Sequence, residues 1–181
     1  MEQLLEMLMG QQNKSNLSDI MGQFGLNEDQ ARRAIGSLLP SVTQGIEKQA
    51  SAKNPTILEK IAHAEQQAYL DDDNQHVYEE EAIEGGNNIL GQILGSKDVS
   101  RQVASQAAEQ TGLDSSILKK LLPIVASMAM GAMGKQANAK GLQQNPNGII
   151  DLVSSMLGGS QTQKDGFGLD DIMSIASKFL R

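Results

Sequence analysis

The side chains most suited to binding phosphate in this sequence form two adjacent basic pairs. They are Arg32, Arg33, Lys119 and Lys120. Each pair follows a glycine, Gly25 or Gly112, that separates two segments with apolar residues at helical spacing. This order is that of a helix-turn-helix, whose second helix reads the major groove of DNA. The units 17–38 and 104–122 therefore give one candidate function, which is DNA binding.

Several features oppose that function. Glu28 and Asp29 lie near the start of the first candidate recognition helix, which is the end that would approach the bases. The second helix is apolar, and the chain carries a net charge of −7. Short helices joined by glycine also occur in any helical bundle. We therefore treat DNA binding as an alternative interpretation rather than the leading one.

The two histidines, His63 and His76, are the first candidates for metal binding. On a helix, His76 would share a face with Glu79 or Glu80, because these residues are three and four positions further on. Such a site would suit a metal-dependent enzyme, which is our third candidate function. The simpler interpretation is a solvated acidic segment that contains a histidine, so we expect no metal and no cofactor.

A calcium loop and a phosphate loop are both incomplete. With Gly166 at the sixth position of a calcium loop, the early ligand positions hold Gln161, Gln163 and Asp165, and Ile172 stands at the twelfth. Only one early ligand is charged, and Asp170 would be explained equally well as a helix cap.

The segment 131–136 lacks the first glycine and the hydroxyl residue of a phosphate loop. No Gly-x-Ser-x-Gly motif is present, so we expect no enzyme activity.

Composition narrows the remaining functions. The chain has 181 residues, only 3% aromatic residues and no Trp, so it lacks the aromatic side chains on which single-stranded nucleic acids stack. It has no Cys, which excludes disulfides and thiolate chemistry and suits a reducing cytoplasm.

The N-terminus is acidic and does not resemble a secretory signal. The most apolar stretch, Leu121 to Met133, is shorter than a membrane span, so we expect a cytoplasmic protein with no membrane partner.

The apolar pattern predicts helices almost throughout, and no segment alternates in the manner of a strand. Between Lys60 and Lys97 there are eight acidic residues and no Lys or Arg. We therefore expect an N-terminal helical repeat over 1–70, an acidic linker over 71–86, a C-terminal helical repeat over 87–160, and a turn with a final helix over 161–181. Asn27, Asp98 and Asp114 are the expected helix caps, and Asn54-Pro55 and Asn145-Pro146 are expected helix starts. Gly85-Gly86-Asn87-Asn88 is expected to interrupt the helices, and 117–133 is the expected buried centre.

The two helical parts resemble one another. A shift of 87 residues places Gly25-Leu26 on Gly112-Leu113 and Lys48-Gln49-Ala50 on Lys135-Gln136-Ala137. The motif Leu38-Leu39-Pro40 matches Leu121-Leu122-Pro123 only with a shift of 83, a difference of about one helical turn. We interpret the sequence as an all-α, multi-helix bundle of two similar, internally duplicated halves, with the register around Pro40 and Pro123 left open.

The same motifs carry a family resemblance. The Leu-Leu-Pro segments, the run Ile-Leu-Gly-Gln-Ile-Leu-Gly at 89–95 and the Leu-Asp-Asp-Ile sequence at 169–172 resemble the bacterial YidB-related family called domain of unknown function 937. The resemblance covers nearly the whole chain and implies an all-helical fold without an assigned activity. It also implies a His at the position of Gln92 and a more acidic loop before the last helix, and this chain departs from the family in both places.

We expect a non-enzymatic interaction or scaffold protein of the cytoplasm. Eight of its methionines lie in apolar segments, and methionine-rich surfaces adapt readily to partner helices. The alternative use of these methionines is ordinary core filling, which we favour. The amphipathic ends, 1–10 and 169–181, remain good sites for self-association or for docking a protein partner.

Overall fold

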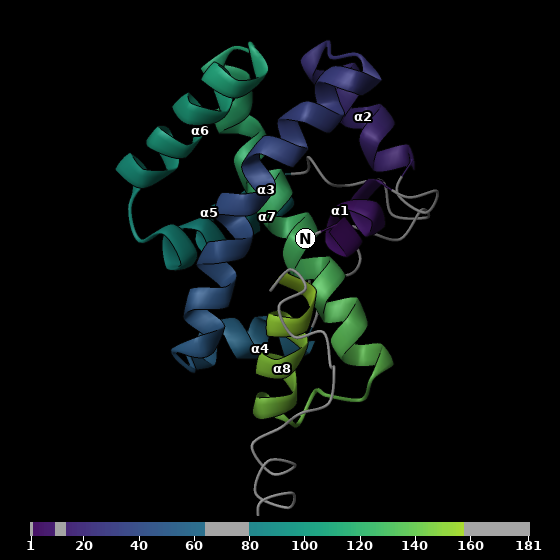
Figure 1. The fold of residues 1–181 in the computed structure, drawn as a ribbon, viewed down its shortest axis with the longest axis vertical. Coiled ribbons are helices and arrows are strands. Elements are labelled where there is room, and N and C mark those ends of the chain that lie inside the picture. Colours follow the sequence, from purple (N-terminus) through teal and green to yellow (C-terminus); the bar gives the residue numbers. More distant parts are fainter. Residues whose placement is uncertain (1, 10–13, 64–79, 158–181) are drawn as a thin grey trace, which may run out of the picture.

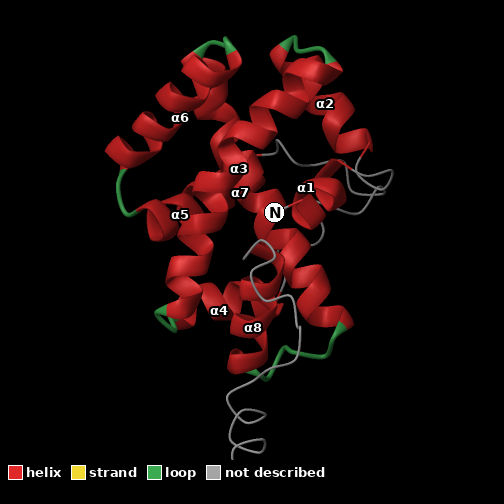
Figure 2. Ribbon diagram, in the orientation of Figure 1, coloured by secondary structure: helices red, strands yellow, loops and turns green. Residues whose placement is uncertain are grey.

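The computed structural model describes residues 2–9, 14–63 and 80–157, and every regular element within them is a helix (Figures 1 and 2). The helices are α1 (Glu2–Met9), α2 (Lys14–Phe24), α3 (Glu28–Ser51), α4 (Pro55–His63), α5 (Glu80–Leu94), α6 (Lys97–Thr111), α7 (Ser115–Ala139) and α8 (Pro146–Leu157). The prediction of an all-α bundle is confirmed over this part of the chain. The helix expected at the C-terminus lies outside the described residues.

Helix α7 forms the centre of the core. Every residue from Leu121 to Gly134 is buried, and α7 packs against α1, α3, α4, α5, α6 and α8. The second long helix, α3, crosses α7 near the middle of the molecule (Figure 1). A helix that is apolar all round has to be covered on all sides. The buried centre therefore lies where the sequence predicts it.

Helix α7 is also longer than its most apolar stretch. By length and composition it is the one helix among the described residues that could cross a membrane, and 83% of its most apolar 18-residue window is buried inside the protein. Our expectation that this region is too short to span a bilayer was wrong, because Pro123 and Gly131 lie within the helix instead of ending it. Packing against the surrounding helices accounts for its apolar composition without a membrane.

Glycines allow α5 to lie close to both long helices. Gly86 of α5 touches the backbone of Pro123 in α7, and a Cβ added there would overlap the Pro123 carbonyl oxygen and lie 2.6 Å from its carbonyl carbon. On α3, a Cβ added to Gly45 would lie 2.9 Å from the Cβ of Ile93 in α5. Because these neighbours are backbone atoms or a branched core side chain, they cannot easily move aside. Helix α5 is therefore held against α7 and α3 where only glycine fits.

The start of α5 changes our interpretation of the acidic segment. We expected a linker over 71–86 and an interruption of the helices at Gly85-Gly86-Asn87-Asn88. Instead, α5 begins at Glu80 and continues through all four of these residues. Gly86 is needed for the close approach of α5 to Pro123, and not for a turn. Residues 64–79, which contain the rest of the expected linker, lie outside the described residues.

The helix caps agree with the sequence at two of three positions. Asn27 and Gln30 form the predicted capping box of α3, and the Asp114 side chain caps α7. Our prediction that Asp98 caps α6 was wrong, because Ser96 is the capping residue. Asp98 instead forms an ion pair with Arg101.

The tight contact at Gly86 gives a direct test of this packing. We predict that Gly86→Ala lowers the free energy of unfolding by about 2–3 kcal/mol, because the new methyl group meets the Pro123 backbone. Gly85→Ala is the matched control, since nothing lies within 4 Å of a Cβ at that position. The control should raise stability by about 0.5–1 kcal/mol through the helix propensity of alanine. Urea unfolding of both variants measures the difference, and equal effects would contradict the contact.

Candidate functional site

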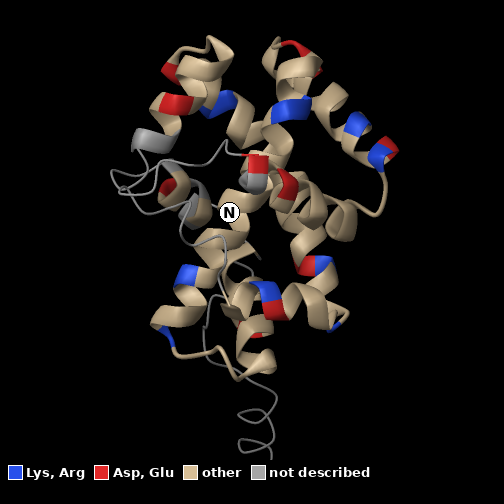
Figure 3. Ribbon diagram, turned by 180° about the vertical axis from the view of Figure 1, so that it is seen from behind, with Lys and Arg blue, Asp and Glu red and all other residues tan. Residues whose placement is uncertain are grey.

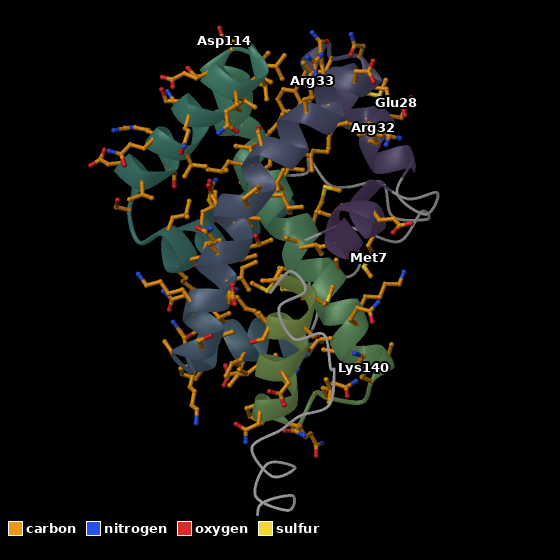
Figure 4. The ribbon with its side chains drawn as sticks, viewed as in Figure 1. Met7, Glu28, Arg32, Arg33, Asp114 and Lys140 are labelled. Carbon is orange, nitrogen blue, oxygen red and sulfur yellow. The ribbon has the colours of Figure 1, made fainter. Side chains whose placement is uncertain are left out.

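The first basic pair lies at the exposed start of α3 (Figure 4). The Arg32 Nη2 atom is 2.7 Å from Glu28 Oε1, with both side chains about half exposed. The Arg33 Nε donates a hydrogen bond to the Asp29 carbonyl oxygen at 3.3 Å. The Glu28 carboxylate therefore offsets the charge that Arg32 would offer to a phosphate.

The second basic pair lies at the start of α7, on the other of two tips at the same end of the molecule (Figure 2). Lys119 and Lys120 are exposed, but α7 is buried from Leu121 onwards. A recognition helix has to present one face along several turns to enter the major groove. From Leu121 to Gly134 no residue of α7 reaches solvent, so its burial argues against docking in that manner.

Asp114 fixes the start of α7 next to this pair (Figure 4). Its Oδ1 atom accepts a hydrogen bond from the Ser116 backbone N–H at 2.7 Å. Hydrogen bonds from Ser116, first from its side chain and then from its backbone, lower the pKa of the Asp114 carboxyl, and the charge of Lys119 contributes less. Asp114 is therefore ionised at neutral pH and offsets part of the positive charge at this tip.

A hollow of about 600 Å³ lies beside the second tip, between α5, α6 and α7, and we call it the basic hollow. Its charged lining residues are Lys97, Arg101 and Lys119, and no carboxylate lines it. Sequence reasoning found Lys119 but missed Lys97 and Arg101, which only the fold brings near it. Arg101 pairs with Asp98 at 3.0 Å, and both side chains are more than half exposed. Figure 3 accordingly shows basic and acidic residues side by side on this tip. The basic hollow can attract an anion, but water screens its charges.

A second hollow, of about 300 Å³, lies between α4 and α8 at the opposite end of the molecule, and we call it the α4–α8 groove (Figure 1). Aliphatic side chains from both helices line it, and they are Leu58, Ala62, Ile149 and Ile150. Polar and charged side chains also contribute, and they are Lys53, Glu59, His63, Gln143 and Asn147. Leu58, Ala62 and Ile149 are themselves buried in the core, and Ile150 is partly exposed. The groove therefore has a small apolar floor and a polar rim.

The two walls of the groove begin in the same way. Asn54 Oδ1 accepts a hydrogen bond from the Thr56 N–H at 3.1 Å, and Pro55 is the first residue of α4. Asn145 Oδ1 accepts one from the Gly148 N–H at 2.9 Å, and Pro146 is the first residue of α8. Proline is well tolerated at the first position of a helix because its missing N–H would have no partner there. The sequence predicts both helix starts, but it does not predict that the two helices meet.

The candidate metal residues do not gather in the part of the chain that the structure describes. Within it, no three His, Asp or Glu side chains form a group that could hold a metal ion. His63 is exposed and lines the α4–α8 groove. His76, Glu79 and the calcium-loop positions 161–172 lie outside the described residues.

Gln92 carries the one buried side-chain polar atom without a hydrogen-bond partner among the described residues. That atom is its Oε1. A buried acceptor without a donor costs about 1–3 kcal/mol of stability. Gln92 lines neither the basic hollow nor the α4–α8 groove, so it is not part of either candidate site.

Comparison with known proteins identifies one family. The family model described as "Bacterial protein of unknown function (DUF937)" matches residues 6–136, which is more than half of the chain. No curated protein and no solved structure matches the chain.

The surroundings of the basic pairs predict weak binding to duplex DNA. We expect little binding at low salt, and no change when Arg32, Arg33, Lys119 and Lys120 are all replaced by Glu. The physical reasons are the Arg32–Glu28 pair, the burial of α7 and the net charge of −7. Fluorescence anisotropy with a random-sequence duplex over a salt titration measures this. Tight binding that weakens steeply with salt and is lost in the fourfold variant would contradict the expectation.

Proposed function

This chain belongs to the DUF937 family of bacterial proteins of unknown function, and we propose that it is a non-enzymatic interaction protein of the cytoplasm. In this proposal the α4–α8 groove binds an amphipathic helix of a protein partner. The observation that carries the proposal is the groove itself, a depression between α4 and α8 with an aliphatic floor and a polar rim. A helix presents apolar residues at i, i+3, i+4 and i+7, and such a stripe fits a groove of this kind.

The size of the groove sets the strength of binding. Because only a small apolar floor is exposed, roughly one or two aliphatic side chains could be buried there, at about 1.5–3 kcal/mol each. Association costs about 4–15 kcal/mol in lost freedom of motion. The groove alone therefore supports weak and reversible binding, as in a transient partner, a second copy of the chain or a tethered segment.

We infer in addition that the chain arose by internal duplication. Helices α2, α3 and α4 follow one another as α6, α7 and α8 do, with Gly25 and Gly112 in the left-handed conformation at φ +63° and +70°. The two long helices also end alike. The Ala52 N–H donates to the Lys48 carbonyl, and the Lys140 N–H donates to the Gln136 carbonyl.

The register of the repeat follows from these ends. The starts of α3 and α7, at Glu28 and Ser115, differ by 87 residues, and their C-caps, Ala52 and Lys140, differ by 88. Pro40 therefore lies 12 residues after the start of α3, whereas Pro123 lies 8 residues after the start of α7. The two prolines differ by about one helical turn, so we favour the shift of 87 and treat the Leu-Leu-Pro match as out of register.

Reciprocal packing supports the same inference. Helix α4 packs on α7, α8 packs on α3, and α4 and α8 contact each other. The last helix of each half thus packs on the long helix of the other half. A two-fold symmetric dimer would show this arrangement if its two copies were joined in one chain. The α4–α8 groove would then lie where equivalent helices of the two halves meet.

A photo-crosslinking amino acid at the groove tests the proposed function. Glu59 is exposed on the groove wall, and Ser155 of α8 is exposed but does not line the groove. We expect a probe at position 59, irradiated in the bacterium that makes the protein, to capture a peptide with an amphipathic helical pattern. Mass spectrometry of the crosslinked peptides identifies it. Capture from position 59 that does not exceed capture from position 155 would rule out the groove as a docking site.

A further inference from the structure

We propose that the resident occupant of the α4–α8 groove is the chain's own C-terminal segment, residues 169–180. This inference rests on the proposed function, because it names the helix that the groove binds. The described part of the chain ends at Leu157, the last residue of α8, which is itself one wall of the groove. A further 24 residues follow, and they lie outside the described residues.

The sequence of the segment suits the groove. Its apolar residues lie on one side of a helical projection, and they are Leu169, Ile172, Met173, Ile175, Ala176, Phe179 and Leu180. On a helical projection the polar residues between them share the opposite face, and they are Asp170, Asp171, Ser174, Ser177 and Lys178. At 12 residues, such a helix would equal α8 in length.

The connection is long enough to reach the groove. Residues 158–168 number 11, and 11 extended residues span about 36–40 Å. From Leu157 back to Ile149 at the groove, α8 covers about 12 Å. The connecting residues are mainly glycine and polar residues, a composition typical of linkers. The segment can therefore turn back along α8 and lie in the groove of its own chain.

Tethering compensates for the small size of the groove. A segment joined by a short linker has an effective concentration on the order of 1 mM at its site. A groove that holds a free helix only weakly can thus be filled by a tethered one.

The docked segment would give the groove a regulatory property. A partner helix and residues 169–180 would compete for the same apolar lining, so the partner has to displace the segment. Partners with a longer or more apolar stripe would do so best.

Disulfide trapping in the full chain tests this proposal, because the natural sequence has no cysteine that could interfere. The test pair is Asn147→Cys with Met173→Cys, since Asn147 is exposed and lines the groove. The matched control is Ser155→Cys with Met173→Cys, which places the first cysteine on the side of α8 away from the groove. Neither surface substitution removes a core side chain, and circular dichroism confirms folding.

We expect an intramolecular disulfide in the test pair, at about tenfold the yield of the control, seen as a faster band on a non-reducing gel. Position 173 already carries a cysteine in both pairs, so the apolar stripe is disrupted at the neighbouring residue by Ile172→Glu. Ser174→Glu, on the polar face, is the matched control. Ile172→Glu should abolish the disulfide, and Ser174→Glu should leave it unchanged.

Two results would overturn the proposal. A disulfide between two chains would mean that a second copy fills the groove. Equal yields in the test and control pairs would mean that the segment does not dock there. If the probe at Glu59 still captures a helix from another protein in either case, the proposed function stands and only the identity of the occupant is wrong.

Discussion

The contact between Gly86 and the Pro123 backbone is the constraint on which the arrangement of this protein depends. It allows α5 to lie directly against α7, and Gly45 allows the same helix to lie against α3. With α5 in place, α7 can be buried on all sides, and the remaining helices pack around the crossing of α3 and α7. The groove lies where α4, which packs on α7, and α8, which packs on α3, contact each other.

Local signals in the sequence predicted much of this fold. The Asn27 capping box, the Asp114 cap and the starts of α4 and α8 after Asn-Pro were all found from neighbouring residues alone. These features depend on hydrogen bonds within one or two turns. The α6 cap was misplaced by two residues, at Asp98 instead of Ser96. The error at α5 came where tertiary packing decides. Glycine inside α5 looked like a turn because its partner, Pro123, lies far away in the sequence.

The candidate site was harder to predict for the same reason. Sequence comparison matched Arg32-Arg33 with Lys119-Lys120, but it could not show that Glu28 pairs with Arg32 or that α7 is buried beyond Lys120. The α4–α8 groove joins residues about 90 positions apart. Leu58, Ala62 and Ile149 are buried core residues, so nothing in the sequence marks them as the lining of a groove.

In the account that we propose, the α4–α8 groove binds an amphipathic helix, and residues 169–180 are its resident occupant. Amide hydrogen exchange of the full chain tests that account most directly. We predict that residues 169–180 are protected, that Ile150→Glu in the groove removes this protection, and that Ser155→Glu does not, while α7 stays protected in all three proteins. Exchange of residues 169–180 at the rate of an unstructured peptide in the unmodified chain would contradict it.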